Sequence, residues 1–286
     1  MNGILNILKP PHMTSSDVAV YLKKIFYPHK VGHMGTLDPN ACGVLLMGVG
    51  KSVRLFDYLL QNKKKYRTTI RFQTSTDTGD ACGKIIDKGG IVPTAKQIKD
   101  ALIGLRGEIL QTPPNYSAAC VDGVRAYDLA RRGVKFELKP KKVFIYSFEL
   151  TDKFGDFFEF DIECSGGTYI RSLCTSLAAS LNTCAYISSL IRLRCGNFDI
   201  LNSITLPQVF ECKEDGTLEK LLIPPEEALN FLEKINISSD EKFKILNGKK
   251  VECKTAGGNY RLFYKDEFLG VAKAENNCLK IKTHLY

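Results

Sequence analysis

Residues 32–47 read Gly32-His33-Met34-Gly35-Thr36-Leu37-Asp38-Pro39-Asn40-Ala41-Cys42-Gly43-Val44-Leu45-Leu46-Met47. The first twelve contain three glycines and a proline, which are incompatible with a regular helix and predict a shaped loop. Asp38 is the single carboxylate of this loop, and Pro39 restricts it to extended conformations. The apolar residues that follow predict a buried strand. The stretch is therefore either an ordinary glycine-rich turn or a loop that carries a functional carboxylate.

Helices and strands are mixed along the rest of the chain. Alternating or apolar runs predict strands at residues 4–8, 44–49, 65–72, 143–151 and 156–164. Capped amphipathic patterns predict helices at residues 17–26, 53–60, 94–105, 126–132 and about 170–181. Because these elements lack a βαβ rhythm, we expect an α+β fold rather than a doubly wound sheet.

The pattern changes after about residue 206. Residues 211–216 are polar and predict a linker, and two prolines at 224 and 225 predict a helix over 228–232. Short β-like runs separated by Gly, Asn and Asp turns then predict a small β-barrel. We therefore expect a catalytic domain over residues 1–228 and a second domain over 229–286.

The net charge of +9 is concentrated around the glycine loop. Residues 1–71 hold eleven Lys and Arg residues against three acids, an excess of +8, and seven more cations follow between residues 125 and 142. Clustered positive charge favours a polyanionic partner, because neutralised phosphates release their counterions. The alternative is a solvated basic surface that only aids solubility.

Several classes of protein lack their motifs here. The run Gly50-Lys51-Ser52 resembles the end of a P-loop, but Leu45 stands where that motif needs its first glycine. There is no H-E-x-x-H zinc motif and no G-x-S-x-G elbow. The ten cysteines contain no C-x-x-C pair, which predicts buried, reduced thiols in a cytoplasmic protein. No apolar run approaches 18 residues, so we expect no membrane segment.

Two tyrosines lie among basic residues. Tyr66 follows three lysines and precedes Arg67, whereas Tyr169 precedes Arg171 by two positions, which on an extended segment places both side chains on one side. A carboxylate, two aromatic rings and an arginine suit a flipped nucleobase, which needs a stacking ring and a charge partner for the acid. Taken singly, each of these residues fits an ordinary structural role better.

Taken together, these segments resemble the TruB family, the bacterial tRNA pseudouridine synthases that act on uridine 55 of the T loop. The matching segments occur in the same order along the chain and include residues 8–15, 32–43, 65–67, 76–80, 114–118, 167–171 and 190–198. The element G-x-x-G-T-L-D-P-x-A-x-G is the most specific. The end of the chain resembles the PUA-type RNA-binding module more weakly. His12, Met34 and Cys120 depart from the family pattern.

The resemblance implies a fold, a reaction and its catalytic residues. The fold would be the pseudouridine synthase fold, with a mixed, largely antiparallel central sheet and flanking helices. The reaction would be isomerisation of uridine by base flipping and attack of Asp38, with Arg171 keeping that carboxylate ionised. Tyr66 would stack on the flipped base and take part in removing the proton from C5. Because nothing is oxidised or imported, no cofactor or metal is expected.

The resemblance also implies contacts with the substrate. His33 would enter the T loop as the target base leaves, and Tyr169 would line the same pocket. Lys9 would support the site, and the basic run supplies Lys64 and Arg67 as RNA contacts. We expect a monomer that binds the T arm of tRNA. The alternatives are a non-catalytic RNA-binding or tRNA-folding protein and an enzyme that works inside a guide-RNA complex.

Overall fold

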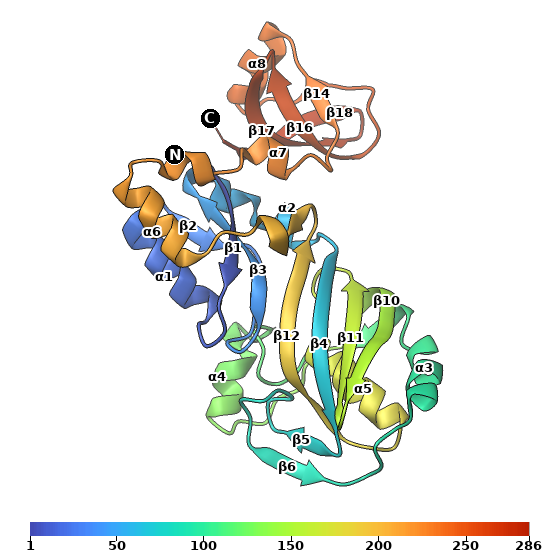
Figure 1. The fold of residues 1–286 in the computed structure, drawn as a ribbon. Helices are drawn as coiled ribbons and strands as arrows, with labels where there is room; N and C mark the ends of the chain where they lie inside the picture. The colour runs from blue at the N-terminus through green and yellow to red at the C-terminus, as the bar shows by residue number, and fades with distance from the viewer. Residues whose placement is uncertain (286) are drawn as a thin grey trace.

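The structure, a computed structural model, describes residues 1–285 as a large mixed sheet with a smaller sheet beside it (Figure 1). The large sheet has the order β1-β3-β12-β4-β11-β10-β7, with β2 paired to β3 and β13 to β12. Its strands are β1 (Gly3–Lys9), β2 (Val31–His33), β3 (Cys42–Val49), β4 (Lys64–Phe72), β7 (Gly107–Gln111), β10 (Lys141–Phe154), β11 (Phe157–Cys164), β12 (Ala185–Cys195) and β13 (Phe198–Asp199). Only the β3–β12 pairing is parallel, so the expected α+β class with a mixed, largely antiparallel sheet is confirmed.

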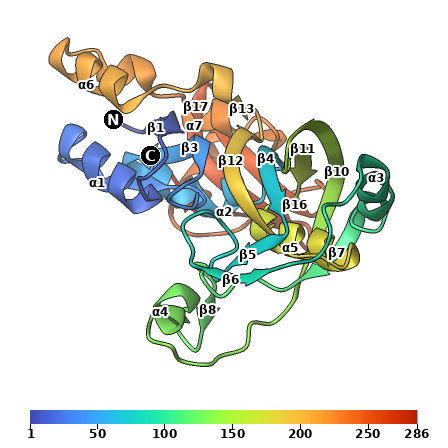
Figure 2. The same ribbon diagram turned by 60° about the horizontal axis from the view of Figure 1, so that its bottom comes forward.

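Helices flank this sheet and connect its strands. They are α1 (Ser15–Ile25), α2 (Phe56–Leu60), α3 (Ala95–Ile103), α4 (Ala126–Arg131), α5 (Ile170–Ser180), α6 (Leu206–Glu214), α7 (Pro225–Ala228) and α8 (Ser239–Leu246), with 3₁₀ turns η1 (Gly50–Leu55), η2 (Ile200–Asn202) and η3 (Leu218–Leu221). Two hairpins stand apart from the large sheet: β5 (Thr74–Thr76) with β6 (Ile85–Lys88), and β8 (Cys120–Val121) with β9 (Val124–Arg125). Figure 2 shows α4 and β8 projecting from the body beside the β5–β6 hairpin.

The main core lies between the large sheet and α5. Strand β4 alternates strictly, so Tyr66, Ile70 and Phe72 are buried on one face while Arg67 lies on the other. The buried face packs against apolar residues of α5 such as Leu173 and Leu177. This period of two is why residues 65–72 could be recognised as a strand from the sequence.

The smaller sheet follows the order β14-β16-β17-β18-β15. Its strands are β14 (Lys234–Asn236), β15 (Val251–Glu252), β16 (Gly258–Tyr264), β17 (Glu267–Glu275) and β18 (Cys278–His284). A second apolar cluster joins it to the large sheet, because Val44 and Leu46 of β3 pack with Val271 and Leu285. The domain boundary at residue 228 stays a prediction.

The structure corrects two predictions for the segment between the large and the small sheet. Residues 211–216 are no linker, because α6 reaches Glu214 from a capping box of Thr205 and Gln208. The helix expected at 228–232 is α7, which starts earlier because proline favours the first turn.

Strand β12 was not predicted at all, since two bulges and two arginines hide its alternation. Only Cys164, Cys174 and Cys195 are buried as expected. Cys82, between β5 and β6, and Cys120, in β8, are exposed, and the other five cysteines are partly exposed; all ten are free. No helix among the described residues is long and apolar enough to cross a membrane.

Candidate active site

The glycine loop connects β2 to β3 and is anchored at both ends by contacts with the protein core. Leu37 is buried in the main core, and the Ser15 hydroxyl both accepts from its amide at 2.9 Å and donates to its carbonyl at 3.2 Å. At the far end, Gly43 has φ of +102°, and a Cβ there would meet the Arg192 carbonyl oxygen at 2.3 Å. Glycine is therefore required where the loop enters the parallel β3–β12 pairing. The carboxylate between these anchors is held on a rigid loop.

Lys9 is a second support of the loop. It is fully buried, and its ammonium donates to the carbonyls of Pro10 at 2.8 Å, Pro39 at 3.1 Å and Met13. Burial lowers the pKa of Lys9 to about 8. Because it does not reach the cavity, Lys9 acts on the site by tying the backbone next to Asp38 to the end of β1.

Asp38 and Arg171 form a two-bond ion pair. Nε of Arg171 donates to Oδ2 of Asp38 at 2.9 Å, and Nη2 donates to Oδ1 at 2.8 Å. The carboxylate side chain is 32% exposed, whereas that of Arg171 is 6% exposed. Burial raises the pKa of the Asp38 carboxyl, and the guanidinium opposes that rise. Because both oxygens accept from a permanent cation, the geometry is that of an ionised carboxylate.

The backbone around Arg171 holds its side chain in place. The guanidinium also donates to the carbonyls of Thr78 at 2.9 Å and Tyr116 at 2.8 Å. Gln111 bonds both the amide and the carbonyl of Tyr169, which caps α5. The expected extended segment is not present: α5 begins at Ile170, so Tyr169 and Arg171 are not alternate residues of a strand. Arg171 contacts Asp38, whereas Tyr169 does not line the cavity over Asp38.

A cavity of about 580 Å³ opens over the carboxylate. Two carboxylates, Asp38 and Asp80, line it together with Arg171, Arg125 and Arg131. Aromatic side chains also line it, with the Arg131 guanidinium over one of their rings. The cavity therefore combines two carboxylates, one of them paired with Arg171, with further cations and aromatic rings, which suits an anionic ligand with a flat ring.

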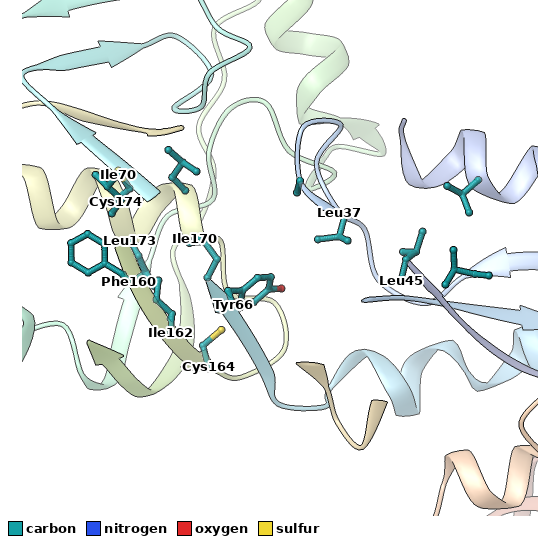
Figure 3. Close-up of a cluster of buried hydrophobic side chains, with 14 of the residues drawn as sticks. Leu37, Leu45, Tyr66, Ile70, Phe160, Ile162, Cys164, Ile170, Leu173 and Cys174 are labelled. Carbon is teal, nitrogen blue, oxygen red and sulfur yellow. The ribbon is translucent and has the colours of Figure 1, made fainter. Parts of the chain in front are cut away.

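Tyr66 lies beneath this cavity rather than in its lining. Figure 3 shows its ring beside Ile162, Cys164 and Ile170, with the hydroxyl directed toward the side where Leu37 lies. The residue is 6% exposed. Burial raises the pKa of the Tyr66 hydroxyl, while the Arg192 guanidinium that contacts it acts in the opposite direction. The hydroxyl is thus shielded from water and touched by a cation.

His33 reaches the cavity from the end of β2. Its Nδ1 atom is buried without a hydrogen-bond partner within the described residues. Burial lowers the pKa of His33, and the charge of Arg192 adds to this effect. The His33 ring therefore lines the cavity with its neutral form favoured, while its Nδ1 atom stays buried.

Lys64 and Arg67 lie away from the cavity around which Asp38, Arg171 and His33 gather. Lys64 is buried, burial lowers its pKa, and its ammonium donates to the carbonyls of Leu60 and Asn62 at the end of α2. Arg67 lies on the opposite face of β4 from Tyr66 and forms a two-bond ion pair with Asp161. Neither residue lines the cavity.

Several residues that build the site were not predicted from the sequence. The Gln111 side chain bonds the backbone of Tyr169, and the Tyr116 carbonyl accepts from the Arg171 guanidinium, contacts that leave no pattern in the sequence. Arg192 is buried on β12, and its partners are backbone carbonyls and one hydroxyl. In the sequence, Arg192 could have been noticed only as an arginine within an apolar run. Two bulges interrupt the alternation of that run, so the strand and its buried face are not evident.

Known proteins resemble the chain along most of its length. The family described as TruB family pseudouridylate synthase (N terminal domain) matches residues 23–170. The chain is 37% identical over 290 residues to tRNA pseudouridine synthase B of Clostridium tetani, covering 98% of both sequences. It is 38% identical over 288 residues to that of Caldanaerobacter subterraneus subsp. tengcongensis, covering 99% of this chain and 98% of the relative.

Solved structures share the fold. A chain of a Cbf5-Nop10-Gar1 complex superposes with a TM-score of 0.74 at 28% identity, covering 95% of this chain and 78% of that one. A chain of the archaeal box H/ACA sRNP Nop10-Cbf5 complex also gives 0.74, at 24% identity, covering 99% of this chain and 85% of the other. The second likeness shows the fold alone.

Proposed function

The chain belongs to the TruB family of pseudouridylate synthases, and from that premise we propose that it converts uridine 55 in the T loop of tRNA to pseudouridine. The observation that carries the proposal is the Asp38–Arg171 pair at the floor of the cavity. It places one ionised carboxylate, on a rigid loop, where a flipped base would enter. The enzyme is an isomerase, and its tRNA substrate follows from the family.

Asp38 supplies the nucleophile in this proposal. Its carboxylate forms a bond to the flipped uridine nucleotide, the bond between N1 and the ribose breaks, and the base turns so that C5 faces the sugar. C5 then bonds to C1′, and the bond to Asp38 breaks so that the free carboxylate is restored. Arg171 holds both carboxylate oxygens and thereby fixes the direction of attack. Every atom of the substrate is retained, so no cofactor is needed for the balance.

Tyr66 completes the rearrangement. Tyr66 first gives its hydroxyl proton to N1 of the base, which keeps the electron pair of the broken N1–ribose bond. Once C5 has joined C1′, the C5–H bond breaks, its proton goes to the Tyr66 oxygen, and its electron pair restores the ring double bond. The burial of Tyr66 supports this role, because proton transfer is more selective where water is excluded. We propose that the base stacks on this side of the cavity.

The remaining residues contact or hold the RNA in different ways. We propose that His33 enters the T loop in place of the departing base, because its ring lines the cavity. Tyr169, the N-cap of α5, lies outside the cavity lining, and we propose that it contacts the base only once the RNA is bound. Lys9, which ties Pro39 to the end of β1, supports the loop. Lys64 and Arg67 act through structure, by capping α2 and bracing β11, since neither lines the cavity.

We propose that the C-terminal domain, over residues 229–286, extends the RNA-binding surface. A groove there is lined by four lysines and a single acid: Lys250, Lys273, Lys280, Lys282 and Glu275. Such a groove suits a phosphate backbone, so affinity for tRNA should fall steeply with salt. A monomer is sufficient for this arrangement, and sedimentation of the free protein tests it.

The test of the proposal is pseudouridine mapping of tRNA. Wild-type protein should convert position 55, whereas Asp38→Asn should give no product above background and still bind tRNA with an affinity within about threefold of wild type, since nucleophile removal mainly affects the chemical step. Wild-type protein that binds tRNA and leaves position 55 unmodified would refute the proposal. Modification of a bare T-arm stem-loop would exclude a need for a guide RNA.

A further inference from the structure

Arg192 is one of the largest fully buried side chains of the protein. It lies on β12, is 2% exposed, and stands directly opposite Tyr66 in the register of the β12–β4 pairing. A bulge separates it from Arg194, whose side chain is exposed and paired with Glu163. Two arginines of one strand therefore have opposite surroundings.

No carboxylate neutralises Arg192 within residues 1–285. Its Nε donates to the Val44 carbonyl at 2.6 Å, its Nη1 donates to the Thr36 carbonyl at 3.3 Å, and the guanidinium contacts the Tyr66 hydroxyl. None of the ion pairs of the described residues includes it. A buried charge without a counter-ion costs stability, and an apolar side chain would fill a sheet position at lower cost. Packing alone therefore does not explain this arginine.

The charge of Arg192 reaches three other groups around the floor of the site. It contributes to lowering the pKa of Lys9, Lys64 and His33, in each case after burial. Lys9 and Lys64 are themselves buried. The region around the Tyr66 oxygen is therefore electropositive, and a low-polarity interior strengthens that field. This field acts against burial, which raises the pKa of the Tyr66 hydroxyl.

We propose that Arg192 is the positioning residue of Tyr66: it directs the hydroxyl toward the cavity and stabilises its phenolate form. The inference rests on the proposed function, in which Tyr66 takes the C5 proton. For the atoms to balance, the Tyr66 proton first passes to N1 of the base, which keeps the electron pair of the broken N1–ribose bond. The phenolate then accepts the C5 proton while the C5–H electron pair returns to the ring. A guanidinium that donates to that oxygen favours the phenolate. It also orients the oxygen so that a second lone pair can accept the C5 proton.

The same side chain connects the base to the nucleophile loop. Thr36 lies two residues before Asp38 in the glycine loop, and Val44 lies in β3 just beyond the loop. One guanidinium therefore contacts the loop, β3 and Tyr66 of β4. A planar group with several fixed donors can make these contacts together, whereas a lysine cannot.

A double-mutant cycle with Tyr66→Phe tests the inference. We expect Arg192→Gln to slow single-turnover pseudouridine formation by about 10- to 100-fold, the scale on which a misplaced proton acceptor acts. The deuterium isotope effect with tRNA carrying 5-deuterouridine should rise at the same time. In the Tyr66→Phe background, the added effect of Arg192→Gln should fall below about threefold, because coupled residues are not additive. Equal effects in both backgrounds would overturn the inference.

Arg194→Gln is the matched control. It removes the same charge from the same strand at an exposed position, so it should leave the rate within about twofold of wild type. If Tyr66→Phe itself keeps the wild-type rate and isotope effect, the assignment of Tyr66 fails, and the proposed function fails with it at that step. The two failures are thus distinguishable.

A measurement that needs no change at Arg192 covers the case in which its variants do not fold. In protein labelled with ¹⁵N-arginine, one guanidinium should exchange slowly with solvent and should shift in Tyr66→Phe. The Arg171 resonance, assigned with Arg171→Lys, serves as internal reference. A buried guanidinium that is insensitive to loss of the Tyr66 hydroxyl would also overturn the inference.

Discussion

The two reactive groups of this site lie in opposite surroundings, although an arginine contacts each of them. Asp38 faces the cavity and is one-third exposed, and Arg171 neutralises it with two bonds. Tyr66 lies in the core beneath the cavity, and Arg192 beside it has no carboxylate partner within residues 1–285. The difference fits two kinds of chemistry. A nucleophile must meet the substrate, whereas an acceptor of a carbon-bound proton benefits from exclusion of water.

The largest effect should come from the exposed pair. Arg171→Lys keeps the positive charge but loses the planar fork that holds both oxygens of Asp38. We expect the single-turnover rate to fall by at least about 100-fold, because a displaced nucleophile loses its orientation. The dissociation constant for tRNA, measured by filter binding, should change little. A rate within tenfold of wild type would show that charge alone orients the carboxylate.

The pH dependence of the modification rate tests the surroundings of Asp38, the exposed reactive group. Burial raises the pKa of Asp38 in spite of Arg171, so the carboxylate protonates at a higher pH than an ordinary aspartate. Below that pKa the rate should fall by up to about tenfold per pH unit, since only the ionised form attacks. Single-turnover rates measured from neutral to acidic pH give the pH at which this fall, the acid limb, begins. An acid limb at or below the usual aspartate range would contradict the burial argument.

Lys9 tests the rigidity of the loop that carries the nucleophile. Its folded pKa of about 8 lies below the ordinary value of 10.5, so the unfolded chain binds more protons between these values. Stability should therefore rise with pH from about 8 to about 10.5, by roughly 1–3 kcal/mol relative to Lys9→Met. Urea unfolding of both proteins at several pH values measures the difference. Parallel stability curves for the two proteins would show that burial of Lys9 has no energetic effect.

The sequence predicted the exposed half of the site better than the buried half. The glycine loop and the alternation of β4 follow from local residue types, so Asp38 and the burial of Tyr66 could be anticipated. The contact between Asp38 and Arg171 came from family resemblance, since the two residues lie 133 positions apart. Arg192 could not be assigned, because its bonds to backbone carbonyls depend on a bulge and a parallel pairing.

The smallest effect should come from the opposite face of the sheet. Arg67 follows Tyr66 in the chain, but the strand turns its side chain away from the cavity toward Asp161. Arg67→Gln should change the modification rate by less than about twofold and the free energy of unfolding by less than about 1 kcal/mol, as for other partly exposed ion pairs. If this variant weakened tRNA binding as strongly as loss of the cavity-wall Arg131, RNA would have to contact both faces of the sheet. The division between an exposed reactive side and a closed supporting side would then be wrong.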